Sequence, residues 1–523
     1  MVGSPIAVGP SAYGFGRPRR FVCRALLAAT LAAADLAAPV PCRAGEQKEP
    51  DIVLVVADDL AAWATGLSGR PEIATPTLDA LAAGGLRMTN AAAVSPVCSP
   101  SRASLLTGRL PSQHGVHDFL REEAGRDHDW LAGETLLPEL LRQAGYRTAL
   151  IGKWHLDASR TEPARGFERW LSYDVTREGW RNQYQHRGAV HLSDDGTAIT
   201  VTGFQTSHLV DAAIAWVARQ GDDRPFFLML APTDTHVPYE GQPERWVARY
   251  RDAQLLDLVR TPPGLLPSAN DAARAGADLP NLLAEYFAGV SHQDAELGRL
   301  IDALDALGQL DDTLVVFTSD QGLMLGQKGL IGKGNATLPQ NLFEESIRVP
   351  MVLHWTGRIP AGATLAIPFD HLDLVQSLLD AAGARPAPET AARIDSPGSS
   401  LFPYLADPAT GWRRWRFAEY GTVRAIADRR YKLIVRSPPL PLGYGDELYD
   451  LLEDPGETRN LLSSADHRAV EQELRTALAA HFARYSVSGR DGFSALEQTP
   501  QNGNEPWRRM AAGAAGPTPA PQR

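Results

Sequence analysis

Residues 51–59 read Asp-Ile-Val-Leu-Val-Val-Ala-Asp-Asp, and this stretch indicates the fold. The run from Asp51 to Ala57 is aliphatic, rich in β-branched residues and without alternation, which is typical of a strand buried on both faces. Strand-like runs alternate along the chain with segments of helical periodicity, and this order predicts a mostly parallel sheet with helices on both faces. The further strands are expected at 148–152, 225–231 and 314–318, and the helices at 77–84, 207–220 and 283–307.

A second, smaller domain is predicted after Ala384. Residues 385–410 are polar and Pro-rich and are expected to be a connection. Short strands are expected at 415–420, 424–428 and 431–435, followed by a helix at 468–483. The fold class is therefore α/β, a large mixed, mostly parallel sheet sandwiched by helices, with a C-terminal α+β domain that contains a short antiparallel sheet. The predicted divisions are a leader at 1–44, a catalytic domain at 50–384, the connection, an α+β subdomain at 411–487, and an extended, partly disordered tail at 488–523.

Composition excludes several classes of protein. The 523 residues carry 51 Lys+Arg against 62 Asp+Glu, a formal net charge of −11, and 44% are hydrophobic, which excludes a disordered chain. The acidic balance argues against nucleic acid or an anionic membrane surface as the main partner. No stretch reaches ~18 apolar residues, so no membrane span is expected. The sequence does not indicate an oligomeric state.

The first 44 residues resemble an export signal. Basic residues at 17, 19, 20 and 24 precede an Ala/Leu-rich stretch at 25–38, and a small residue, Ala44, precedes polar sequence. This order predicts a secretory leader and a periplasmic or secreted protein. Arg19-Arg20 resembles a twin-arginine signal, so the export route stays open, and a disordered extension is the alternative. Cleavage near Ala44 would remove Cys23 and Cys42 and leave Cys98 as the single cysteine.

Polar side chains follow four of the predicted strands. Asp58-Asp59 ends the first, Lys153-Trp154-His155 the second, Thr233 to His236 the third and Asp320-Gln321 the fourth. In open parallel sheets, sites form at the carboxyl ends of the strands, so these residues are expected to converge. The carboxylates of Asp58, Asp59 and Asp320 and the amide oxygen of Gln321 are hard ligands, which suit Ca²⁺ or Mg²⁺ and not zinc. A solvated turn or helix cap is the simpler interpretation of either pair taken alone.

The stretch Cys98-Ser-Pro-Ser-Arg102 is the most informative of the chain. Ser-Pro-Ser is a helix-start signal, so Cys98 is expected at or just before a helix N-terminus. Free N–H groups and the helix dipole favour an anion there. A small buried thiol at a turn is the alternative.

These motifs, taken in order, resemble the type I, formylglycine-dependent sulfatase family of the alkaline-phosphatase-like superfamily. Cys98 to Arg102, continued by Ala-Ser-Leu-Leu-Thr-Gly-Arg109, is similar to the family signature, and the resemblance spans roughly residues 50–485. The other matching motifs are Asp58-Asp59, Gly152-Lys-Trp-His155, His236-Val-Pro238, Ser319-Asp-Gln-Gly322, Gly332-Lys-Gly334, Glu344 to Pro350, and Glu447 to Glu457.

The resemblance implies a mechanism and a role for each residue. Cys98 would be oxidised by a separate formylglycine-generating enzyme, and the hydrated aldehyde would attack sulfur to form a covalent sulfate ester. The roles that it implies are the following: Asp58, Asp59, Cys98, Asp320 and Gln321 hold the metal; Arg102 holds the hydrate; Lys153 and Lys333 grip the sulfate; His155 assists elimination; and His236, alone or with Lys333, is the general acid.

The expected activity is hydrolysis of an organic sulfate ester, with a sulfated carbohydrate, either a small molecule or an oligosaccharide, as the preferred substrate class. One alternative is a phosphonate or phosphate-ester hydrolase on the same scaffold, and another is a non-catalytic protein that binds sulfated glycans. Gln321 departs from the Asn or His that the family usually has there. His114, His117 and Asp118 follow the signature and are candidates for lining the substrate pocket, with a helix-end cap as the alternative.

Overall fold

The structure is a computed structural model, which describes residues 49–121, 128–157, 161–177, 179–221, 223–259, 266, 268–269, 278–437, 444–462 and 464–512. Residues 45–523 group into one compact unit by their contacts. The predicted leader lies outside the described residues. The division of the chain into domains remains a prediction.

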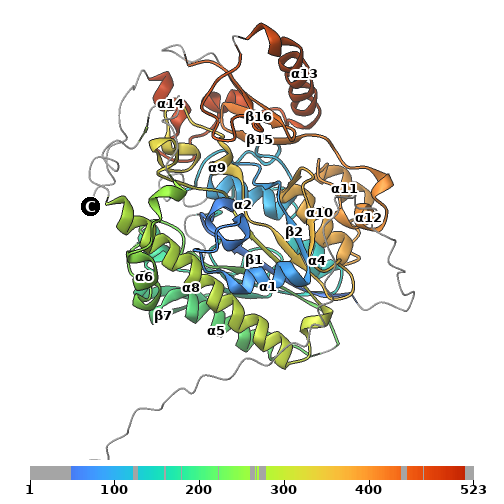
Figure 1. Cartoon of the computed structure of the whole chain (residues 1–523). Helices are drawn as coiled ribbons and strands as arrows, with labels where there is room; N and C mark the ends of the chain where they lie inside the picture. Colours follow the sequence, from blue (N-terminus) through green and yellow to red (C-terminus); the bar gives the residue numbers. More distant parts are fainter. Residues whose placement is uncertain are drawn as a thin grey trace, which may run out of the picture. The chain divides into compact units, whose positions relative to one another are not determined.

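A ten-stranded mixed sheet is the centre of the described part of the chain (Figure 1). Its order is β13-β2-β12-β9-β1-β8-β4-β5-β6-β7, and the middle strands from β9 to β5 are mutually parallel. The strands run as follows: β1 Asp51–Ala57, β2 Leu86–Met88, β4 Arg147–Gly152, β5 Arg169–Tyr173, β6 Arg187–Asp194, β7 Thr197–Phe204, β8 Phe226–Ala231, β9 Thr313–Ser319, β12 Val352–His354 and β13 Ala363–Leu365. The predicted mixed, mostly parallel sheet is confirmed.

Helices cover both faces of this sheet because β1 is apolar on both. Val53 and Val55 belong to one buried cluster with α1 (Pro76–Gly84), α5 (Gln205–Val217) and α8 (Leu279–Ala306), and α6 (Glu244–Arg251) packs on α8. Leu54 and Val56 belong to another cluster, with α2 (Cys98–Thr107), α4 (Leu137–Gln143) and α10 (His371–Ala381). Figure 1 shows α5 and α8 together on the same face. Successive residues of a strand point to opposite faces, so an unbroken apolar run supplies both cores.

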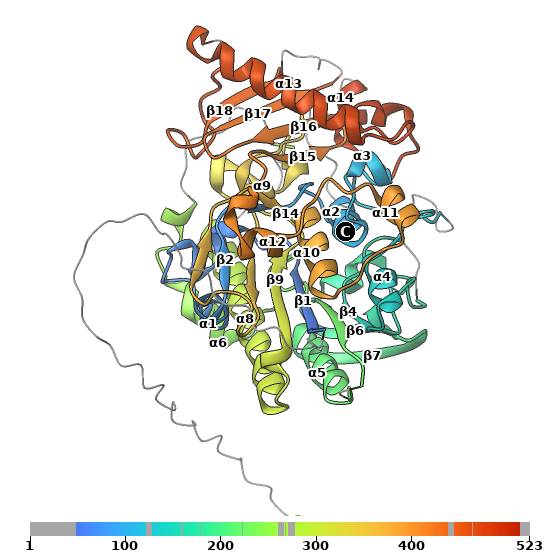
Figure 2. The same ribbon diagram turned by 90° about the vertical axis from the view of Figure 1, so that its right-hand side faces the viewer.

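The C-terminal part forms a separate antiparallel sheet. Its strands, in order, are β15 (Arg416–Tyr420), β16 (Val423–Ala427), β17 (Tyr431–Arg436) and β18 (Glu447–Asp450). Figure 2 shows helix α13 (Arg468–Tyr485) lying along this sheet. Its Leu474, Leu478 and Phe482 share a buried cluster with the strands. The predicted antiparallel sheet is confirmed, and β18 completes it.

Two smaller predictions were wrong. The segment 385–410 is not a plain connection: it contains α11 (Pro388–Ile394) and α12 (Leu401–Ala406), and Leu401 is buried in the core beside α10. Residues 488–512 are not an extended tail, since they form a 3₁₀ helix at Gly492–Glu497 and then α14 (Pro506–Ala511). Trp507 of α14 is buried edge-on against Tyr420, at a centroid distance of 5.5 Å, and this contact ties the segment down. Residues 513–523 lie outside the described part.

The remaining elements are short. Two-stranded ladders join β3 (Ala91–Ala92) to β14 (Phe369–Asp370) and β10 (Met324–Leu325) to β11 (Ile331–Gly332). The short helices are α3 (Pro111–His114) and α9 (Glu344–Ile347). Within the described residues, no helix is both long and apolar enough to cross a membrane.

Candidate active site

Residues from four strand ends and one helix start meet at the carboxyl edge of the central sheet. In the strand register Ala57 pairs with Ser319 and Gly152 pairs with Ala231, so the next residues of each strand leave the sheet at the same level. One ligand atom from each of Asp58, Asp59, Cys98 and His236 lies within 4.8 Å of the others. The predicted convergence is therefore present.

Backbone geometry aims two of these segments. Gly152 has φ +117°, and a Cβ there would lie 2.2 Å from the carbonyl oxygen of Ala231. Only glycine fits so close to the neighbouring strand, and the next residue, Lys153, then turns its side chain inward. Asp59 has φ +62°, in the left-handed region that costs a residue with a Cβ about 1 kcal/mol or more. Its N–H donates to Asp320 Oδ1 at 3.1 Å, which compensates for that strain.

Cys98 is the first residue of α2 and is buried between charged groups. Lys333 Nζ lies 2.9 Å from its Sγ, Gln321 Nε2 donates to Sγ at 3.3 Å, and the thiol faces Asp58 Oδ1 at 3.7 Å. Burial raises the pKa of the Cys98 thiol, but Lys153 and Lys333 outweigh burial and hold this pKa well below its usual range. A low-pKa cysteine at a helix N-terminus is chemically reactive rather than a structural hydrophobe.

Three cations and three carboxylates surround Cys98. Lys153 Nζ contacts both oxygens of Asp58, at 2.9 and 2.7 Å, and Lys333 Nζ donates to Asp59 Oδ1 at 2.5 Å. Arg102 donates from Nε to Asp320 Oδ2 at 2.9 Å, and its Nη2 lies 3.8 Å from Asp58 Oδ1. All these side chains are buried or nearly so. The three carboxylates hold Lys153, Lys333 and Arg102 in position around Cys98, where these cations can bind an anion.

The donor set fits a hard cation. Asp58, Asp59 and Asp320 supply carboxylate oxygens, and the amide oxygen of Gln321 is buried without a hydrogen-bond partner, while its Nε2 donates to Asp59. An orphaned amide oxygen beside three carboxylates is what a Ca²⁺- or Mg²⁺-type ion would satisfy. Like Asp58 and Asp59, Asp320 already accepts hydrogen bonds, in its case from Arg102 and from the Asp59 N–H.

The two predicted histidines occupy different environments. His236 Nδ1–H donates to the Val237 carbonyl at 2.6 Å, and its Nε2 lies 3.6 Å from Asp59 Oδ2. His155 has φ +61°, and its Nδ1 is buried without a partner. Burial, followed by the charge of Lys153, lowers the pKa of His155 well below its usual range, so this imidazole is neutral.

The structure adds residues that no sequence motif marks. Tyr184, at the end of a 3₁₀ helix (Gly179–Tyr184), stacks on the His236 ring with centroids 3.8 Å apart and planes 6° apart. Lys153 Nζ lies 5.0 Å from the same Tyr184 ring. His186 Nε2–H contacts the carbonyl oxygens of His236 and Pro238, at 2.9 and 2.5 Å. This segment therefore supports the His236 loop from one side.

The loop that carries Lys333 is fastened to the C-terminal sheet. Asn341 Nδ2 donates to the Lys333 carbonyl at 3.1 Å, inside the loop. The following residue, Leu342, accepts from the buried Lys432 of β17, and Gln340 Nε2 donates to Thr422 Oγ1 at 3.1 Å. Lys333 thus takes its position from strands that follow it by about a hundred residues.

His114, His117 and Asp118 pack against other parts of the chain. His114 Nε2 contacts Ser104 Oγ at 3.0 Å, and His117 Nε2 contacts the Arg490 carbonyl at 2.8 Å. Asp118 Oδ1 accepts from Tyr420 OH at 2.8 Å. The contacts of His117 and Asp118 join the signature region to the C-terminal part.

Comparison with known proteins places this geometry in a family. The sulfatase family model matches residues 50–384, and the model described as N-sulphoglucosamine sulphohydrolase, C-terminal, matches residues 339–484. The chain is 27% identical to an N-acetylglucosamine-6-O-sulfatase of Bacteroides thetaiotaomicron, over 88% of this chain and 91% of that protein. It is 32% identical to arylsulfatase A of Bos taurus, over 86% and 89% of the two chains.

A solved structure has the same fold. It was determined in complex with its substrate, D-glucosamine-2-N,6-O-disulfate. It superposes with a TM-score of 0.69 at 24% identity and covers 84% of this chain and 98% of its own.

Proposed function

Because the chain belongs to the sulfatase family, we propose that it hydrolyses sulfate esters of carbohydrates through a formylglycine made from Cys98. The position of Cys98 carries this proposal: it opens a helix and lies within 4 Å of a lysine and an aspartate. The choice of carbohydrate esters is supported by the Bacteroides relative, named for N-acetylglucosamine-6-O-sulfate, and by the sugar disulfate bound in the structural neighbour.

The first step is attack on sulfur. The hydrated formylglycine carries two hydroxyls. The oxygen of one bonds to sulfur while the bond from sulfur to the sugar oxygen breaks, and the proton of this hydroxyl passes to Asp58, whose Oδ1 faces the Cys98 position at 3.7 Å. Lys153 and Lys333, whose charges both act on Cys98, stabilise the charge that builds on the sulfate oxygens. His236 donates the proton that the leaving sugar oxygen needs, since its Nε2 faces the site beside Asp59.

The second step releases sulfate without an attacking water. His155, held neutral, removes the proton of the remaining hydroxyl, the carbonyl re-forms, and the bond from carbon to the sulfate oxygen breaks. A molecule of water then rehydrates the aldehyde. Arg102 is buried against Asp320 and the Lys153 carbonyl, so we assign it to positioning of these groups.

A divalent cation held by Asp58, Asp59, Asp320 and Gln321, with the Cys98 position, would lower the pKa of the attacking hydroxyl and offset the charge of the sulfate. We propose Ca²⁺, because flexible all-oxygen sets of this kind suit it, with Mg²⁺ as the second choice. Lys153, Lys333 and Arg102 contact these carboxylates and keep them from repelling one another before the ion binds.

Maturation of the protein would require a modifying enzyme and export from the cytoplasm. We propose that a formylglycine-generating enzyme converts Cys98, and that the chain is exported to the periplasm or the medium by its first 44 residues. The basic and apolar pattern of those residues supports export.

The first test is the mass of the tryptic peptide from Met88 to Arg102, in protein produced by the native host. Conversion of cysteine to formylglycine lowers this mass by about 18 Da. Loss of sulfate-ester hydrolysis in Cys98→Ala should accompany it. An unmodified Cys98 in active protein would overturn the mechanism and leave the family assignment in place.

A second assay separates the alternatives. Specificity constants for an aryl sulfate and an aryl phosphonate, measured on one preparation, tell a sulfatase from a phosphonate hydrolase on the same scaffold. Binding of a sulfated glycan without release of free sulfate, in protein from a host able to convert the cysteine, would instead identify a non-catalytic binding protein whose Cys98 stays unconverted.

A further inference from the structure

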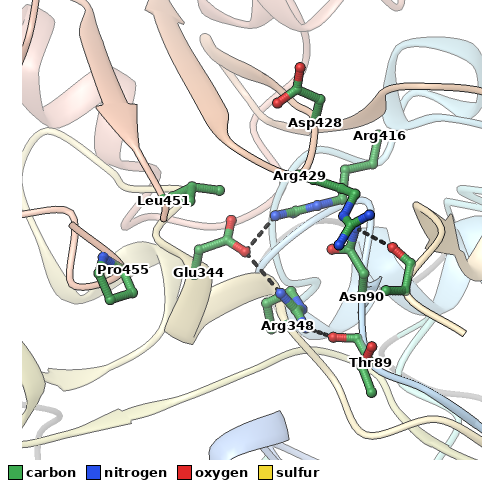
Figure 3. A pocket seen from close by; sticks show the side chains of 10 residues that line it. Thr89, Asn90, Glu344, Arg348, Arg416, Asp428, Arg429, Leu451 and Pro455 are labelled. Carbon is green, nitrogen blue, oxygen red and sulfur yellow. Dashed lines mark hydrogen bonds and ion pairs between the residues drawn. The ribbon is translucent and has the colours of Figure 1, made fainter. Parts of the chain in front are cut away.

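A pocket of about 270 Å³ lies between the central sheet and the C-terminal sheet, away from the residues assigned above (Figure 3). Asn90 and Arg348 line it from the side of the central sheet, and Arg416 and Arg429 line it from the C-terminal sheet. We call it the arginine pocket after these three arginines. Its lining includes Glu344 and Arg348 of the motif from Glu344 to Pro350, for which the proposed mechanism has no use.

The pocket has more positive charge than its carboxylates neutralise. Glu344 is the shared partner of Arg348, at 3.4 Å, of Arg416, and of the buried Lys432, at 2.9 Å. The dashed lines in Figure 3 show both arginines directed at this one carboxylate. The pocket's other carboxylate, Asp428, is paired with Arg414, which does not line it. Lys432 also pairs with Glu457, at 2.8 Å, so within the pocket Glu344 is the one carboxylate that Arg348 and Arg416 share.

Arg429 adds a third guanidinium to the pocket. It is exposed, and among the described residues no carboxylate forms an ion pair with it. Figure 3 shows it beside Arg416 and Asn90. Arg416 is 4% exposed, and its Nε is buried without a hydrogen-bond partner, so Glu344 does not fully compensate this guanidinium for the loss of water. Burial lowers the pKa of Arg348; the charge of Glu344 opposes this shift, and the like charge of Arg416 adds to it.

The size and the walls of the pocket limit the ligand. At about 30 Å³ per water molecule, 270 Å³ holds roughly nine waters, which is more than one oxyanion fills. Leu451 and Pro455 form an apolar wall opposite the arginines, and such a wall suits the C–H face of a sugar ring. Three guanidinium groups supply the forked donors that match sulfate and carboxylate oxygens.

We propose that the arginine pocket is a second anion site, which binds the sulfate group of a sugar unit other than the one being hydrolysed. Arg348, Arg416 and Arg429 contact the sulfate oxygens, and the sugar lies against Leu451. The sugar part of this inference rests on the proposed function, whereas binding of a sulfate-type oxyanion does not. The same chemistry would also accept free inorganic sulfate, and the experiment separates the two sources.

The first test is a soak of wild-type crystals in sodium selenate, with the anomalous signal of selenium as the readout. A peak between the three arginines is expected, together with a peak at Lys153 and Lys333. A peak at those lysines alone would overturn the second site and keep the proposed function. A peak in the arginine pocket alone would support the second site and count against the proposed function.

The second test measures binding in solution by calorimetry, on the Cys98→Ala background so that no substrate is turned over. Sodium sulfate and glucosamine 6-sulfate are the two probes. Arg429→Ala, at an exposed position, should weaken binding at the arginine pocket about tenfold or more, as loss of a charged hydrogen bond does. Arg459→Ala, an exposed arginine outside the pocket, is the matched control and should leave binding unchanged.

The outcomes decide the source. Glucosamine 6-sulfate that binds more tightly than sulfate, with binding of both probes weakened in Arg429→Ala, supports a sugar ligand. Equal affinity for the two probes overturns the sugar part and leaves an inorganic anion site. No effect of Arg429→Ala on either probe overturns the site, because the ion pairs of Arg348 and Arg416 with Glu344 are then structural only.

Discussion

Replacement of Tyr184 by alanine tests whether this residue supports the general acid. The ring stacks on His236 at 3.8 Å and lies 5.0 Å from Lys153 Nζ. An aromatic pair contributes about 0.5–1.5 kcal/mol, and a cation over a ring about 0.5–2 kcal/mol when desolvated. Together they amount to about 1–3.5 kcal/mol of positioning, which corresponds to a loss of about 5- to 400-fold in kcat/KM.

The assay compares leaving groups. A proton from His236 matters most when the departing oxygen is a poor leaving group, as in a sugar or alkyl sulfate, and least for a nitrophenyl sulfate. Tyr184→Ala should therefore reduce turnover of the alkyl ester much more than turnover of the nitrophenyl ester. A structural defect alone would reduce both equally, and a melting temperature measured on the same sample tests for that.

The control is Tyr184→Phe, which keeps the ring and its face. It should retain activity within about threefold, because the aromatic pair persists. Equal rates for wild type and a folded Tyr184→Ala protein on the alkyl ester would refute the reasoning.

Three further outcomes are expected. Lys333→Ala removes a donor to the reacting group and should lower kcat about 100-fold or more, and Lys333→Arg, which keeps the charge but not the fit beside Cys98, should recover only part of it in a sulfate-release assay. Gly152→Ala puts a Cβ 2.2 Å from the Ala231 carbonyl oxygen, at φ +117°. It should lower the free energy of unfolding in urea by about 1–3 kcal/mol and lower activity. The control is Gly411→Ala, at φ +77° with no atom within 4 Å of its Cβ, which should leave activity intact. Burial raises the pKa of Asp118 to about 7, so the folded state binds more protons than the unfolded state, whose carboxyl titrates near 4, and stability falls as pH rises between these values. From pH 5 to pH 8 the loss should be about 2–3 kcal/mol, and it should disappear in Asp118→Asn; an unchanged pH slope in that variant would contradict the assignment.

The convergence of the site could be predicted because it depends on strand direction alone. Asp58, Lys153 and Asp320 directly follow parallel strands, and His236 follows the fourth after a short loop, so their meeting needs no knowledge of side-chain packing. Their pairing could not be predicted. That Lys153 contacts Asp58 while Lys333 contacts Asp59 depends on loop conformations that no periodicity records.

Other features were missed for identifiable reasons. Tyr184 ends a 3₁₀ helix in a segment without a motif, and only the fold brings it to His236. The hairpin of β6 and β7 did carry a signal, since Asp195-Gly196 joins the two strands with positive φ at both residues. Trp507 follows polar sequence, and it is buried by a tertiary contact with the distant Tyr420 that no local sequence pattern indicates.

Because the Lys333 loop is attached to the C-terminal sheet, that sheet cannot be exchanged freely between relatives of this chain. Lys432 fixes Leu342, and Thr422 fixes Gln340, so the lysine beside Cys98 depends on strands encoded after the whole of the central sheet. If the C-terminal sheet were exchanged for that of a relative, the new sheet would need a buried cation at the position of Lys432. Without it, Lys333 would lose its position beside Cys98, even though every N-terminal motif were still present. The two parts are therefore expected to be inherited together, as one unit of selection.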